Sequence, residues 1–161
     1  MRIALITGAT SGIGRATALR LAQDDFNLII TGRRLELLET LKKEIEVKYK
    51  RDVLILNFDV RDRKAVEKAI KGLPERWRKI DVLVNNAGLA VGLNHIQDGL
   101  IEDWEQMIDT NVKGVLYITR MVSPMMIEIF PCSSERSVKL PSRSLDLSMP
   151  TSSAAFRLFR T

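Results

Sequence analysis

The sequence predicts an α/β fold, built on a doubly wound parallel sheet with helices on both faces. Two observations lead to this expectation. Short apolar runs of four to six residues alternate along the chain with longer amphipathic stretches. The short runs are also apolar at successive positions, which is typical of parallel strands buried on both faces.

The first predicted strand is Ile3–Ile6, which ends in the glycine-rich segment TGATSGIG. Glycine-rich segments form turns, so the strand is expected to end there. The first helix is predicted over Arg15–Gln23, where Ala16, Leu19 and Ala22 share one face.

The second and third strands are separated by one amphipathic helix. Asn27–Thr31 is apolar and closes at Gly32, and Val53–Phe58 is the next apolar run. Between them, Leu35–Tyr49 has leucine and isoleucine at helical spacing with charged residues opposite.

The fourth strand follows a third helix. The helix is predicted over Asp62–Leu73 and the strand over Asp81–Val84, followed by NNAG. A loop then leads to a long helix over Glu102–Met126. Such a β-α repeat predicts a Rossmann-like doubly wound sheet with strand order 3-2-1-4.

The pattern stops near Glu128. Residues 129–161 contain eight serines and no long periodic segment, which is typical of an irregular or disordered tail. We therefore expect a partial dinucleotide-binding domain over residues 1–128 and an irregular tail over 129–161.

Composition excludes several classes of protein. No apolar run approaches the roughly 18–20 residues of a membrane helix. Cys132 is the only cysteine, which leaves no internal disulfide or zinc cluster and fits the reducing cytoplasm. The net charge of +5 has no accompanying nucleic-acid motif. We expect a cytoplasmic protein without a bound metal and without a nucleic-acid or membrane partner.

The segment TGATSGIG lies between a predicted strand and a predicted helix. Gly8, Gly12 and Gly14 allow a tight turn, close approach of a pyrophosphate and close helix packing. The phosphates would lie at the helix N-terminus, where N–H groups and the helix dipole favour anions. Any tight turn of this type favours glycine, so the spacing alone is weak evidence.

The end of the second strand reads TGRR. An acid at this place binds the ribose 2′-hydroxyl of NAD, whereas arginine accepts the 2′-phosphate of NADP. Arg33 and Arg34 stand there without an acid, which predicts NADP(H), with NAD less favoured. The alternative is a pair of surface arginines at the start of the next helix.

Five segments together resemble one family. TGATSGIG, TGRR, NFDV, NNAG and DTNVKG, in this order and spacing, are similar to the short-chain dehydrogenase/reductase family. The loop and long helix after NNAG resemble the NADP-dependent 3-hydroxy acid (serine-type) dehydrogenases. The resemblance covers about residues 1–128 and implies an oxidoreductase that acts on the hydroxyl of a small 3-hydroxy acid or related alcohol.

The resemblance also implies roles for individual residues. Asp59 and Val60 would flank the adenine, and Asn111 would be the catalytic asparagine, bending the long helix around a water in a proton relay. Asn111 is otherwise an ordinary polar helix residue. The remaining cofactor residues implied are Gly8, Thr10, Ser11, Gly12, Ile13 and Gly14 for the pyrophosphate, Arg33 and Arg34 for the 2′-phosphate, and Asn86, Ala87 and Gly88 for the ribose and the central strand.

The family's serine, tyrosine and lysine have no counterpart in this sequence. Tyr49 and Tyr117 are the only tyrosines, and neither begins a Y-x-x-x-K motif. A tyrosine with an ordinary pKa near 10 is a poor base at neutral pH, so the lysine charge matters to the chemistry.

Two readings remain open. In the first, the chain is a truncated or frameshifted form of an NADP-dependent oxidoreductase and is catalytically inactive. In the second, it is a non-catalytic NADP(H)-binding module or a partly folded remnant. Members of the family form homo-oligomers, and that assembly is in doubt for this chain.

Overall fold

The computed structural model describes residues 2–92 and 94–129. The predicted tail lies outside the described residues, apart from Ile129, which ends the last helix. The predicted boundary at residue 128 therefore stays a prediction.

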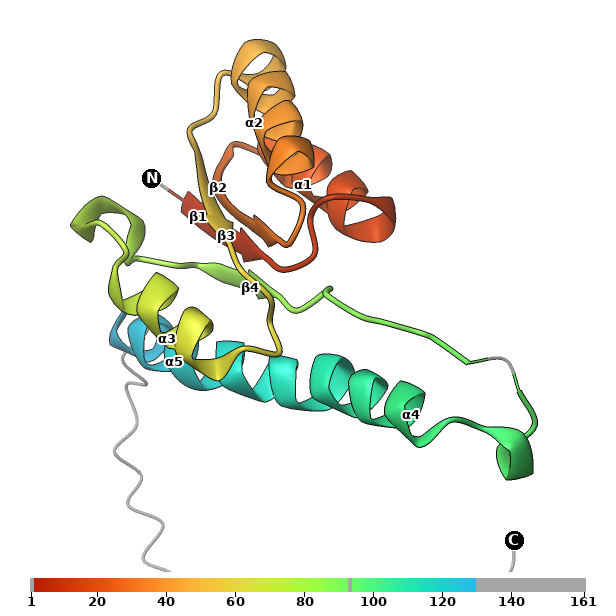
Figure 1. The fold of residues 1–161 in the computed structure, drawn as a ribbon. Helices are drawn as coiled ribbons and strands as arrows, with labels where there is room; N and C mark the ends of the chain where they lie inside the picture. The colour runs from red at the N-terminus through yellow and green to blue at the C-terminus, as the bar shows by residue number, and fades with distance from the viewer. Residues whose placement is uncertain (1, 93, 130–161) are drawn as a thin grey trace, which may run out of the picture. The chain divides into compact units, whose positions relative to one another are not determined.

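Four parallel strands form one sheet in the order β3-β2-β1-β4 (Figure 1), which confirms the predicted topology. The strands are β1 (Arg2–Ile6), β2 (Phe26–Gly32), β3 (Val53–Asn57) and β4 (Val82–Val84). In the register, Leu5 lies opposite Ile29 of β2 and Leu83 of β4. Parallel strands in this order place all their carboxyl ends along one edge of the sheet.

Helices cover both faces of the sheet, as the apolar runs predicted. Helices α1 (Gly12–Gln23) and α2 (Leu35–Tyr49) lie on one side, and α3 (Arg63–Lys71) and α5 (Val115–Ile129) lie on the other (Figure 1). Successive residues of β1 enter different cores, because side chains alternate along a strand. Ala4 and Ile6 face the α1 and α2 side, whereas Ile3 and Leu5 face the α3 and α5 side.

The first and third helices begin at different places from those predicted. Helix α1 begins at Gly12 rather than at Arg15, so the end of the glycine-rich segment is its first turn. Helix α3 begins at Arg63, and Asp62 is its N-cap, where the carboxylate accepts N–H bonds from Lys64 and Ala65. An N-cap residue has extended dihedrals, so a helical sequence pattern does not separate it from the helix.

The long C-terminal helix is interrupted. Helix α4 (Ile101–Ile108) passes into a π-helix over Asp109–Gly114 and then into α5. Helix α5 also continues past Pro124 to Ile129, beyond the predicted end at Met126. Proline lacks one backbone donor, but here the helix goes on for more than a turn after it.

None of the described helices combines the length and the apolar character that a membrane crossing requires.

Candidate nucleotide-binding site

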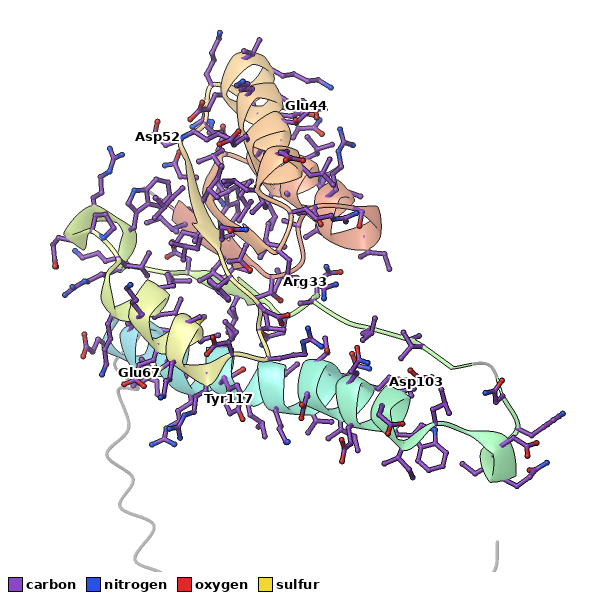
Figure 2. The ribbon with its side chains drawn as sticks, viewed as in Figure 1. Arg33, Glu44, Asp52, Glu67, Asp103 and Tyr117 are labelled. Carbon is purple, nitrogen blue, oxygen red and sulfur yellow. The ribbon has the colours of Figure 1, made fainter. Side chains whose placement is uncertain are left out.

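A cavity of about 390 Å³ opens at the carboxyl ends of the strands. This is the edge at which open α/β sheets bind their ligands. Its lining contains segments that follow each of the four strands, and Arg33, labelled in Figure 2, lies at the end of β2. The lining residues are Gly8, Thr10, Ser11, Gly32, Arg33, Arg34, Phe58, Asp59, Val60, Asn86, Ala87, Gly88, Leu89 and Thr110.

The turn after β1 depends on glycine at Gly8. This residue has a φ of +66°, and a Cβ on it would lie 2.8 Å from the Cα of Ala87. A side chain at Gly14 would collide with Asn86 and with the carbonyl of Gly8. The two glycines therefore allow the turn, helix α1 and the segment after β4 to pack closely together.

The start of helix α1 is suited to an anion. Its N-cap, Ser11, makes no side-chain capping bond, and the first turn contains no acidic residue. The first N–H groups of a helix have no partner within it, so those of α1 remain available to a ligand. Gly12, Ile13 and Gly14 form this turn but do not line the cavity, and Ile13 is largely exposed.

The two arginines after β2 differ in their contacts. Arg34 donates to the hydroxyls of Thr10 (2.7 Å) and Ser11 (3.0 Å), and thereby connects the start of α2 to the glycine-rich turn. The side chain of Arg33 is 62% exposed, and its nearest acidic partner is Asp59, at 3.9 Å. Both arginines line the cavity and give this end of it a positive charge.

Asp59 follows β3 and is held by Arg61, a residue that the sequence reasoning missed. The Arg61 guanidinium donates to both carboxylate oxygens, with the shortest distance 2.7 Å to Oδ2. Burial acts to raise the pKa of Asp59, but the hydrogen bonds and charge of Arg61, helped by Arg33, lower it below its ordinary value. The same contact with Asp59 raises the pKa of Arg61.

Hydrogen bonds to Thr7 connect the segment after β4 to the end of β1. Thr7 is a second residue that the sequence reasoning missed. The Thr7 hydroxyl accepts the backbone N–H groups of Asn86 and Ala87, both at 3.0 Å. The Asn86 side-chain amide donates to the carbonyls of Thr7 and Gly8. A threonine directly after a strand in front of a glycine-rich turn is the signal that could have identified it.

Asn111 lies in the π-helix and does not line the cavity. Its side chain accepts the N–H of Leu89 and donates to the carbonyl of Leu89, both at 2.8 Å. Single turns of π-helix often occur at functional sites. The structure therefore connects the long helix to the cavity wall, since Leu89 is a lining residue, while the catalytic role of Asn111 stays a prediction.

The structure thus brings most of the expected cofactor residues to one cavity. Those that line it are Gly8, Thr10, Ser11, Arg33, Arg34, Asp59, Val60, Asn86, Ala87 and Gly88, whereas Gly12, Ile13, Gly14 and Asn111 lie outside its lining. Gly32, Phe58, Leu89 and Thr110 line it without having been expected. Within residues 2–92 and 94–129, no three His, Cys, Asp or Glu side chains gather as metal ligands would.

A family model described as short chain dehydrogenase matches residues 2–136, which is most of the chain. The chain belongs to the short-chain dehydrogenase family. This finding confirms the resemblance drawn from the five sequence segments.

Individual relatives of this short-chain dehydrogenase chain agree with the assignment. It is 50% identical over 126 residues to a Salmonella typhi protein named NADP-dependent 3-hydroxy acid dehydrogenase YdfG, covering 78% of this chain and 49% of the relative. The solved serine dehydrogenase from Escherichia coli shares 46% identity with a TM-score of 0.73, covering 79% of this chain and 57% of that one.

A second solved structure, the closed form of serine dehydrogenase complexed with NADP+, shares 45% identity with a TM-score of 0.71. The match covers 79% of this chain and 50% of that one. The short-chain dehydrogenase chain thus spans about half the length of the curated relatives it matches.

Proposed function

We propose that this chain binds NADP(H) in the cavity at the carboxyl ends of its strands. The single observation that carries the proposal is that Arg33 and Arg34 line this cavity at the end of β2. This is where an acid would bind the ribose of NAD and where arginine accepts the additional phosphate of NADP. The relatives named for NADP support the same choice.

The other residues of the cavity fit such a ligand. Gly8 has no side chain to block a pyrophosphate, and the first turn of α1 offers N–H groups to it. Asp59 and Val60 lie at the end of β3 and suit the adenine, while Asn86, Ala87 and Gly88 suit the ribose. A cavity of about 390 Å³ lies within the usual range for small-molecule sites.

For an enzyme that combines this domain with the family's serine, tyrosine and lysine, the activity we propose is NADP-dependent oxidation or reduction at the hydroxyl carbon of a small 3-hydroxy acid or related alcohol. The cofactor supplies the hydride chemistry. Asn111 is proposed to order the relay next to the cavity wall through its two bonds to Leu89.

The present chain is proposed to bind the cofactor without turning over substrate. Its 161 residues contain no tyrosine with a lysine four positions later. The residue four positions after Tyr49 is Val53, and the residue four positions after Tyr117 is Met121. A lysine at that spacing matters because a nearby positive charge favours the ionised form of a tyrosine, and a tyrosine must be readily ionised to act as a base at neutral pH. The cytoplasmic location stays a prediction.

Titration calorimetry with NADPH and with NADH tests the binding proposal. We expect NADPH to bind at least about tenfold more tightly, because charge-assisted bonds to a phosphate are strong. The fragment 2′,5′-ADP should compete with NADPH, and 5′-AMP should compete weakly. Equal affinity for the two cofactors would contradict the proposal.

Arg33→Ala tests whether Arg33 causes the preference for NADPH over NADH, and Arg20→Ala is the matched control. Arg20 lies in the last turn of α1, far along the helix from the glycine-rich turn, and its side chain is 71% exposed. We expect Arg33→Ala to weaken NADPH by about tenfold and NADH little, and Arg20→Ala to change neither. In a separate assay, oxidation of NADPH with a 3-oxo acid should not exceed the buffer control.

A further inference from the structure

Arg61 holds the carboxylate of Asp59 through several bonds at once. The Nε of Arg61 donates to Oδ1 and Oδ2 of Asp59 at 3.1 and 3.0 Å, and its Nη2 donates to Oδ2 at 2.7 Å. The backbone N–H of Arg61 adds a bond to Oδ1 at 3.0 Å. A guanidinium in this arrangement neutralises a carboxylate and restricts its orientation.

The carboxylate held in this way lies next to the arginine expected to bind the 2′-phosphate. Asp59 lines the cavity and Arg61 does not. The Arg33 guanidinium lies 3.9 Å from Oδ2 of Asp59, at the outer limit of an ion pair, and is more exposed than that of Arg61. Asp59 is therefore bonded to Arg61 and only weakly associated with Arg33.

An un-neutralised carboxylate at this position would oppose a bound phosphate in two ways. It would attract Arg33 away from the phosphate, and it would repel the phosphate directly. Asp59 is also ionised at neutral pH, since its pKa is lowered despite partial burial. Arg61 makes the shortest contacts to this charge and is its principal counterion.

We propose that Arg61 is a positioning residue that determines the preference for NADP over NAD, by engaging Asp59 and leaving Arg33 to the 2′-phosphate. The inference rests on the proposed function, because it assumes that this cavity binds the cofactor. Arg61 does not touch the cofactor in this account and acts only through Asp59. Its loss should therefore change the affinity for the phosphorylated cofactor more than the affinity for the other.

Arg61→Gln tests the inference directly. The substitution removes the charge but retains the backbone N–H bond to Asp59. We expect the dissociation constant for NADPH to rise by about fivefold, the scale of one partly exposed charge pair, and that for NADH to change by less than about twofold. Calorimetry on the full chain with the two cofactors measures both.

Two further variants separate charge from structure. Arg61→Lys keeps the charge without the two-pronged contact and should retain most of the NADPH preference. Adding Asp59→Asn to Arg61→Gln removes the unbalanced carboxylate. Because Asp59 is also proposed to flank the adenine, which NADPH and NADH share, the quantity compared is the ratio of the two affinities, and the double variant should recover that ratio to within about twofold of the original chain. Thermal unfolding of each variant shows that it is folded.

The outcomes decide between this inference and the proposed function. If the original chain prefers NADPH and Arg61→Gln weakens both cofactors equally, Arg61 has only a structural role and the inference is wrong. No change in either affinity would overturn it as well. If the original chain shows no NADPH preference, the proposed function itself fails. An Arg61→Gln chain that does not fold would transfer the test to Arg61→Lys, where equal weakening of both cofactors would again overturn the inference.

Discussion

The two parts of the sheet differ in how completely their own chain covers them. In β1 and β2, four residues of each strand are fully buried, whereas all three residues of β4 are only half-buried. Helix α4 buries none of its own residues, while α1 and α2 each bury three. Strands β1 and β2 with helices α1 and α2 therefore contribute more to stability than β4 and α4 do, because buried apolar area stabilises in proportion to its extent.

Strands β1 and β2, which precede two segments of the cavity lining, are mostly buried, although the long helix exposes part of its apolar surface. Ile108, Val112 and Leu116, on the long helix, are each more than half exposed. The glycine-rich turn and the two arginines follow β1 and β2, and these strands contribute Leu5 and Ile30 to the cores on the two faces of the sheet. Substitutions in the two parts should consequently have very different effects.

The largest expected effect comes from the same substitution made in each part. Leu5→Ala, at a fully buried position, should lower the free energy of unfolding by about 2–5 kcal/mol. Leu116→Ala, at a residue 61% exposed, should change it by less than about 0.5 kcal/mol. Urea unfolding measures both, and a Leu116→Ala cost as large as that of Leu5→Ala would show that α5 is covered in solution.

A smaller effect separates two glycines of the same turn. Gly8 and Gly12 both have positive φ, of +66° and +53°, but a Cβ at Gly8 meets Ala87 whereas one at Gly12 meets nothing within 4 Å. Gly12→Ala should cost about 1–2 kcal/mol from backbone strain alone. Gly8→Ala should cost about 2–4 kcal/mol, because overpacking adds to the strain. Equal costs in thermal unfolding would contradict the close contact between the turn and the segment after β4.

The smallest effect concerns the two bonds between the long helix and the segment after β4. Asn111→Ala removes both bonds to Leu89 and should lower stability by about 1 kcal/mol, since exposed hydrogen bonds contribute little net energy. Hydrogen exchange at the Leu89 amide should become faster. Asn111→Asp keeps the acceptor and loses the donor, so it should protect that amide better than Asn111→Ala does. Unchanged exchange in Asn111→Ala would show that the bonds are not formed in solution.

The pattern of apolar residues and glycines in the sequence predicts much of the fold. The apolar runs and their spacing predict four parallel strands in the order that the strand pairing shows, and the helix predicted over Leu35–Tyr49 has the observed bounds. The glycine-rich segment and TGRR predict the place of the cavity, and part of each segment lines it, namely Gly8, Thr10, Ser11, Gly32, Arg33 and Arg34. These features are local, since hydrophobic period and glycine placement act through neighbours in the chain.

The tertiary structure alone decided which polar side chains meet. Thr7 joins the turn after β1 to the segment after β4, and Asn111 in the π-helix bonds to Leu89, in both cases between residues far apart in sequence. Asp59 and Arg61 are two positions apart, yet their contact depends on the turn after β3, which brings the guanidinium over the carboxylate. Hydrogen bonds of this kind require a distance and an orientation that residue types do not specify. The sequence by itself thus determined the layers and the place of the cavity, while packing decided how its charges are paired.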